Sequence, residues 1–132
     1  MVEWHTKSKK KKSGGKRKSL RRCTKKLAWR GGTAAQTKGE TGAEETREGK
    51  TGRGNTSKVR ATSTKFVNVY NGTKVVKAEI IAVAENDANR LFARSNIVTK
   101  GAKIKIKIGN EEKQAVVTNR PGQDGIINAK LA

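Results

Sequence analysis

Few side chains in this sequence are of the types that support catalysis or metal binding. His5 and Cys23 are its only histidine and cysteine, whereas a structural zinc site usually has four such ligands. The acidic residues Glu85, Asp87 and Asp124 are isolated and have no partner histidine to orient them for acid–base work. We therefore predict no enzymatic activity, no metal site, no cofactor and no small-molecule substrate.

One short motif imitates a nucleotide-binding loop. Gly49-Lys50-Thr51 matches the end of the pattern G-x-x-x-x-G-K-[ST], but Glu44 occupies the position of the leading glycine. No strand-like segment precedes the motif, so we reject nucleotide hydrolysis.

The chemistry that the sequence favours is phosphate binding. The formal net charge is +20, from 31 basic and 11 acidic residues, and a polyanion such as nucleic acid would relieve the resulting self-repulsion. A membrane partner is not expected, because no stretch approaches the roughly 18 apolar residues of a membrane span and the basic runs lack an apolar helical face. No apolar stretch of a signal peptide follows the first residues, which predicts a cytosolic protein.

The charge is unevenly distributed and suggests three regions. Residues 1–30 carry +12, residues 31–57 carry no net charge and residues 58–132 carry +8. Residues 1–30 are predicted to be a basic RNA-binding extension, disordered in isolation because apolar residues are few. Residues 31–57 are rich in glycine and threonine, which is typical of a flexible linker or loop. Residues 58–132 are predicted to fold.

The basic extension contains two features besides its charge. Ser13-Gly14-Gly15 separates two cationic clusters and lets the backbone bend sharply between them. Trp4 and Trp29 either stack on exposed bases or pack against protein, and packing at an RNA–protein boundary is slightly favoured.

The folding region alternates between strand and turn patterns. Strands are predicted at 59–70, 74–83, 103–108, 114–118 and 126–131, from β-branched and aromatic composition and period-two alternation. Turns are predicted at 109–112 and 121–125, and Asn71-Gly72 favours a type I′ hairpin turn. Residues 86–94 have apolar side chains at helical spacing, so we expect a short helix capped by Asn86 or Asp87, with Leu91 and Phe92 facing the core.

These elements define the predicted fold class. The chain should be mainly β: a small antiparallel β-barrel with one short helix and a long basic N-terminal extension. Closure of the barrel would remove exposed strand edges. In the segment 103–108, the lysines Lys103, Lys105 and Lys107 lie on the face opposite the isoleucines. They form either an electropositive sheet face or a protected strand edge, and the pattern alone leaves both readings open.

Two long segments resemble a known family. Residues 83–102 and 117–129 are similar to signatures of the S8e (eS8) family of small-subunit ribosomal proteins, and Trp4, Ser8 and residues 13–16 resemble the family's opening motif. The resemblance implies a β-barrel body with a basic extension, of the short archaeal type, in the cytoplasmic ribosome. It implies small-subunit ribosomal RNA and neighbouring ribosomal proteins as partners.

The predicted RNA contacts are cationic side chains of the extension, the linker and the barrel. Asn89 and Asn96 are expected to cap the helical turn rather than to bind RNA, and Arg120 either contacts RNA or pairs with Asp124. The alternatives that remain are a free-standing DNA- or chromatin-binding protein, an RNA enzyme and a membrane-active protein. The predicted contacts are Lys7, Lys9, Lys10, Lys11, Lys12, Lys16, Arg17, Lys18, Arg21, Arg22, Lys25, Lys26, Arg30, Arg53, Lys58, Arg60, Arg90, Arg94, Lys100 and Arg120.

Overall fold

The computed structural model describes residues 2–18, 25–42, 44–52 and 54–132. They form two compact units, Met1–Ala34 and Ala35–Ala132. The first contains a two-stranded antiparallel sheet of β1 (Glu3–Trp4) and β2 (Arg30–Gly31), with the 3-10 helix η1 (Leu27–Trp29) directly before β2. The second contains a closed barrel and a three-stranded sheet.

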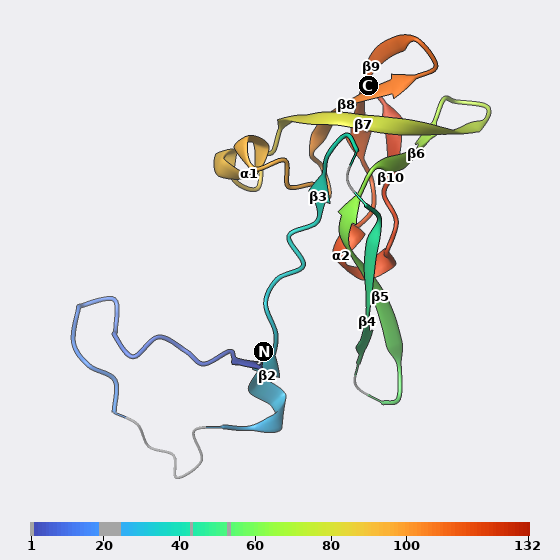
Figure 1. Ribbon diagram of the computed structural model, residues 1–132. Coiled ribbons are helices and arrows are strands. Elements are labelled where there is room, and N and C mark those ends of the chain that lie inside the picture. Colours follow the sequence, from blue (N-terminus) through green and yellow to red (C-terminus); the bar gives the residue numbers. More distant parts are fainter. Residues whose placement is uncertain (1, 19–24, 43, 53) are drawn as a thin grey trace. The chain divides into compact units, whose positions relative to one another are not determined.

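Five strands close the barrel in the order β10-β6-β7-β8-β9. The predicted small barrel is confirmed, but it is not wholly antiparallel, because β10 runs parallel to β6, with Asn128 opposite Asn68. An odd number of strands that alternate in direction must bring two parallel neighbours together at closure. The strands are β6 (Phe66–Tyr70), β7 (Val75–Glu85), β8 (Lys103–Ile108), β9 (Glu111–Val117) and β10 (Asn128–Leu131) (Figure 1).

The barrel interior is filled by β-branched side chains. Ile104 and Ile106 of β8 are fully buried, whereas Lys103, Lys105 and Lys107, which alternate with them, are exposed. This confirms the alternation predicted for residues 103–108. Alternate residues of the other strands complete the same core, among them Val67, Val69, Ile80, Ala115, Val117 and Ala129.

The segment predicted as one strand, 59–70, is two strands in different sheets. Lys65 separates β5 (Ser57–Thr64) from β6, and β5 is the centre of the sheet β3-β5-β4. Its partners β3 (Lys38–Gly39) and β4 (Thr46–Thr51) lie in the segment expected to be a linker or loop. Every residue of β4 is exposed, so it has no hydrophobic pattern that would have predicted a strand.

Threonine hydroxyl groups on either side of β3 bond to β5 and to the barrel. The Thr37 hydroxyl donates to the carbonyl of Ala61 in β5 at 2.6 Å, and that of Thr41 donates to the carbonyl of Ile80 in β7 at 3.1 Å. A Cβ atom at Gly39 would lie only 2.8 Å from the Val98 side chain. Glycine is therefore required where β3 meets the barrel.

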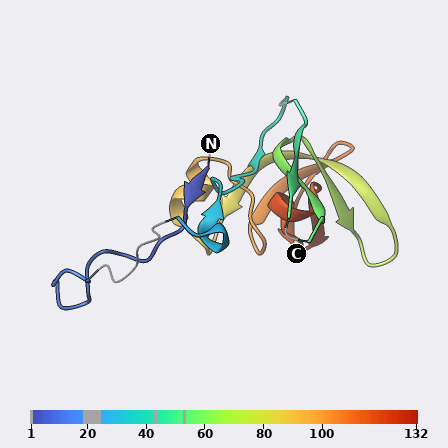
Figure 2. The same ribbon diagram turned by 90° about the horizontal axis from the view of Figure 1, so that it is seen from below.

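The turns and helices depart from their sequence predictions. The β6–β7 loop spans residues 71–74 and is closed by a hydrogen bond from Asn71 N to Lys74 O. Gly72 has positive φ but Asn71 does not, so the type I′ prediction is wrong. The described residues form two short α-helices rather than one, α1 (Arg90–Arg94) and α2 (Pro121–Asp124), the latter where a turn was predicted. In both views, α1 and the β6–β7 loop lie on opposite sides of the barrel (Figures 1 and 2).

The α1 region differs from its sequence prediction in the residue that caps the helix and in the side chains that the helix buries. Asn89, rather than Asn86 or Asp87, caps the helix by accepting a hydrogen bond from Leu91 N at 2.9 Å. Asn86 is buried; its amide donates to Ile97 O at 3.1 Å and its oxygen accepts from the Thr99 hydroxyl at 3.0 Å. Leu91, predicted to face the core, is 65% exposed. A helix of five residues turns too little of its surface toward the barrel to bury both predicted apolar side chains.

Candidate RNA interface

The basic extension reverses direction at its glycine pair. Lys10 pairs with Lys16 in an antiparallel bridge, and Arg17 N donates to Lys9 O at 2.8 Å. Gly14 adopts φ +82°, a left-handed conformation that glycine accommodates without strain. The predicted bend between the two cationic clusters is therefore present, and it brings the clusters side by side.

This short hairpin places like charges opposite one another. Lys10 faces Lys16, both are exposed, and like charges directly opposed destabilise a pair of strands. Glu3 is the one acidic residue in the first 34 positions of the sequence, so carboxylates offer little compensation there. An external anion would relieve the repulsion.

The two tryptophans lie in the small β1–η1–β2 arrangement. Both are half-buried, and Trp4 is opposite Arg30 in the strand pair. The ammonium of Lys26 lies 5.7 Å from the centre of the Trp29 ring, a cation–π distance. The His5 imidazole lies against Gly31. Protein contacts thus occupy part of each indole, as the packing interpretation expects, and stacking on bases remains an untested prediction.

In the barrel unit, carboxylates neutralise some cations and leave others available. The described residues of this unit form five ion pairs: Arg47–Glu45 at 3.2 Å, Arg60–Glu48 at 2.5 Å, Lys65–Glu79 at 3.2 Å, Lys103–Glu85 at 2.7 Å and Lys113–Glu111 at 2.8 Å. Arg60, a predicted RNA contact, is thus already bonded through two of its nitrogens to one carboxylate. Its neighbour on the same strand, Lys58, is exposed.

A cationic group surrounds α1. Arg90 and Arg94 begin and end the helix, Lys100 follows in the next turn, and all three are exposed. Asn96 has φ 52° and accepts a hydrogen bond from Val83 N at 3.3 Å. Asn89 caps the helix as expected, whereas the C-cap of α1 is Ser95 and the Asn96 side chain bonds to β7 instead.

Lys38 joins the α1 group although it is distant in sequence. It forms an antiparallel bridge with Ile97, and Gly39 N donates to Asn96 O at 2.9 Å. Sequence reasoning missed Lys38 because its segment read as a linker. Only the long-range pairing of β3 places it here.

Arg120 precedes α2 as its N-cap residue and has an exposed side chain. Asp124 accepts a hydrogen bond from the backbone N–H of Arg120 at 3.2 Å and another from the Asn119 amide at 3.1 Å. The alternative pairing of Arg120 with Asp124 thus occurs through the backbone, and it leaves the guanidinium on the surface.

The lysine row of β8 lies on an internal strand, bonded to β7 on one side and β9 on the other. Protection of a free edge therefore does not explain it. The hydrogen bond and charge of Lys103 hold the pKa of Glu85 below its usual value, and the same pairing raises the pKa of Lys103. At the β8–β9 turn, Lys113 likewise lowers the pKa of Glu111.

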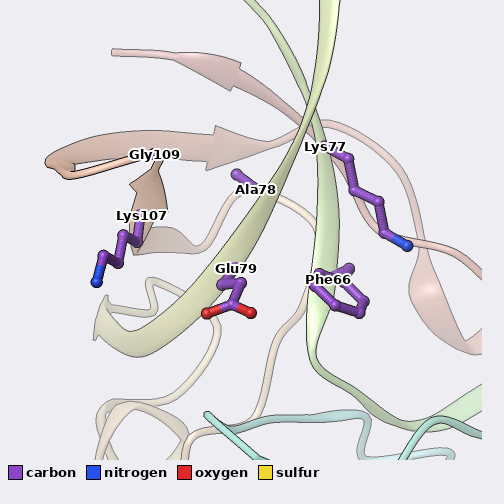
Figure 3. Close-up of a pocket in the computed structure, with 6 residues that line it drawn as sticks. All are labelled: Phe66, Lys77, Ala78, Glu79, Lys107 and Gly109. Carbon is purple, nitrogen blue, oxygen red and sulfur yellow. The ribbon is translucent and has the colours of Figure 1, made fainter.

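Sequence reasoning also missed a cation–aromatic group on the outer face of the barrel. It consists of Phe66 with Lys65 and Lys77, and it lies beside Glu79 and Lys107 (Figure 3). No sequence motif marks it, because its members meet only through the pairing of β6, β7 and β8.

Some predictions fall on residues outside the described ranges: Arg21, Arg22, Arg53 and Cys23. Within residues 2–18, 25–42, 44–52 and 54–132, no group of three or more His, Cys, Asp or Glu side chains is arranged to hold a metal ion. The helices in these ranges are all too short or too polar to cross a membrane.

Comparison with known proteins gives consistent results along the chain. Residues 4–132 match the family model described as ribosomal protein S8e. The chain is 45% identical over 124 residues to the small ribosomal subunit protein eS8 of Pyrobaculum aerophilum, covering 92% of this chain and 89% of that protein. It is 47% identical over 79 residues to the eS8 protein of Haloarcula marismortui, covering 60% and 61% of the two chains.

Proposed function

Because the chain belongs to the S8e family of ribosomal proteins, structural components of the small ribosomal subunit and not enzymes, we propose that it binds ribosomal RNA through its basic arm and the cationic surface of its barrel. The arm is residues 1–30 and the body is residues 58–132; residues 31–57 connect them and also contribute β3 and β4 to the sheet around β5. The site of action is the cytoplasmic ribosome, where ribosomal RNA and adjacent ribosomal proteins are the partners.

The observation that carries this proposal is the basic hairpin at residues 9–17. Its lysines oppose one another across the strand pair, an arrangement that is unfavourable without an anion. A phosphate backbone supplies such an anion along its whole length, and each neutralised phosphate releases counterions. We infer that the arm follows RNA phosphates and reaches its stable conformation on binding.

The barrel contributes a second set of cations to the proposed interface. Arg90, Arg94 and Lys100 project from α1 and the adjacent turn, and Lys38 lies beside them on β3. Arg120 and Lys58 are further exposed candidates. Among the described residues, none of these six is in an ion pair of the kind that occupies Arg60. Their charge is therefore available to phosphates, which account for most polar contacts in protein–nucleic acid interfaces.

Sedimentation in a sucrose gradient tests the proposal directly. Tagged protein expressed in an archaeal cell should sediment with the small subunit, and it should remain there at a salt concentration that strips loosely bound basic proteins. Recovery with nucleoid DNA and not with the small subunit would contradict the proposal and support the free-standing DNA-binding alternative, which the family assignment does not favour.

A further inference from the structure

The Phe66 ring at the start of β6 has two lysine ammonium groups close to it. The ammonium of Lys77 lies 3.9 Å from the ring centroid and that of Lys65 lies 5.3 Å away. Both distances are within the range of cation–π attraction. The ring is half-buried on the outer face of the barrel, and Lys77 is exposed.

The two lysines are held in different ways. Lys65 is also ion-paired to Glu79 at 3.2 Å, so a carboxylate offsets its charge. Lys77 has no ion pair within the part of the chain that the structure describes. An aromatic face attracts an ammonium through its quadrupole without carrying a net charge. Phe66 therefore orients Lys77 and leaves its full positive charge available to a ligand.

Lys77 borders a groove of about 460 Å³ that residues of β6, β7 and β8 line together with Gly109. Lys107 of β8 lies on the opposite side, and Glu79 lies between Lys107 and Phe66 (Figure 3). The strand register explains this order, because Glu79 is opposite Phe66 on one side and Lys107 on the other. Among the described residues Lys107 has no ion-pair partner, and the nearby carboxylate of Glu79 is engaged by Lys65.

We propose that this groove is a seat for the phosphates of an RNA strand, with Lys77 and Lys107 as the phosphate-binding residues and Phe66 as the residue that positions Lys77. This site lies outside the contacts predicted from the sequence, and it rests on the proposed RNA-binding function. An ammonium that is already oriented loses less side-chain entropy when it binds. Lys105 continues the row of exposed lysines along β8. An RNA strand carries several phosphates in succession, and a row of cations matches that arrangement.

Lys77→Gln and Lys107→Gln test the phosphate contacts. The assay is filter binding of the full chain to a transcript of small-subunit ribosomal RNA at several salt concentrations. Each variant should lower the slope of log affinity against log salt by about 0.7, the value for one phosphate contact on a single strand. The same relation predicts about fivefold weaker binding at 0.1 M salt. The matched control is Lys113→Gln, which removes the same charge from a lysine that is already paired to Glu111 and should change the slope much less.

Phe66→Leu tests the positioning role. It keeps an apolar side chain and removes the aromatic face, so it should weaken binding in the wild-type background and add nothing in the Lys77→Gln background, a coupling that a double-mutant cycle measures. Phe66→Trp should restore the affinity because it restores the face. An additive effect of Phe66→Leu in the Lys77→Gln background would overturn the positioning role, and thermal melting identifies any loss of folding.

The outcomes separate this proposal from the proposed function. If the wild-type chain fails to bind the transcript, the RNA-binding function itself is wrong. If the wild-type chain binds but both lysine variants bind with an unchanged slope, the groove proposal alone is overturned. Unchanged RNA binding with loss of an acidic protein from reconstituted subunits would assign the groove to a protein partner instead.

Discussion

Neutralising the basic hairpin is the most direct test of how this chain binds RNA. The variant replaces the lysines and arginine at positions 9–12 and 16–18 by glutamine, which removes seven positive charges from a chain with net charge +20. If all seven contact phosphates of single-stranded character, the salt slope should fall by about 5, at about 0.7 for each contact.

The hairpin geometry lowers this limit. Lys10 and Lys16 form an isolated antiparallel bridge, and successive side chains on extended backbone point in opposite directions, so only part of the set can face one RNA strand. We therefore expect the slope to fall by about 3 to 4, with affinity at 0.1 M salt reduced by about 10³-fold or more.

The assay is filter binding to a small-subunit ribosomal RNA transcript over a range of salt concentrations. The matched control replaces the same lysines by arginine, which preserves the charge and should preserve the slope. A glutamine variant whose slope equals that of the wild type would refute the reasoning, and so would an arginine control that binds as weakly as the glutamine variant.

Three further predictions concern the barrel. Asn86→Ala removes a buried amide and should lower the free energy of unfolding by about 1–3 kcal/mol, because it leaves buried backbone groups without partners. Urea denaturation measures this free energy, and an unchanged midpoint would contradict the prediction. Ile104→Ala should cost about 2–5 kcal/mol through the cavity it leaves in a fully buried position, whereas a loss below 1 kcal/mol would show that the barrel collapses around the cavity. Pairing with Lys103 lowers the pKa of Glu85 in the folded protein. The pair therefore stabilises the fold at pH values above the pKa that Glu85 has in the unfolded chain, and this stabilisation is lost as the pH falls through the pKa of Glu85 in the folded protein. The melting temperatures of wild type and Glu85→Gln should therefore differ above about pH 4.5 and converge in acid; a constant difference would argue against the pairing. Because the pairing raises the pKa of Lys103, the same contribution should also be lost as pH rises through that value, above 10.5.

Much of the candidate interface follows from local sequence. The bend at Gly14 depends on nearest neighbours, so the residue types were sufficient to predict it. The contacts of Lys38 and Lys77 could not be predicted in this way. Lys38 meets Ile97, and Lys77 meets Phe66, only through strand pairing between separated segments.

By itself, the sequence predicted a polyanion as the class of partner, and it determined the family and the alternation of β8. Charge is a sum over residues and does not depend on the fold, and period-two burial depends only on the geometry of one strand. The tertiary structure alone decided the division of residues 59–70 between two sheets, the parallel closure of β10 on β6, and the exposure of Leu91. It also decided which cations are neutralised by carboxylates. These features depend on which distant segments pair, and an exposed strand such as β4 contains no local pattern that reveals its partner.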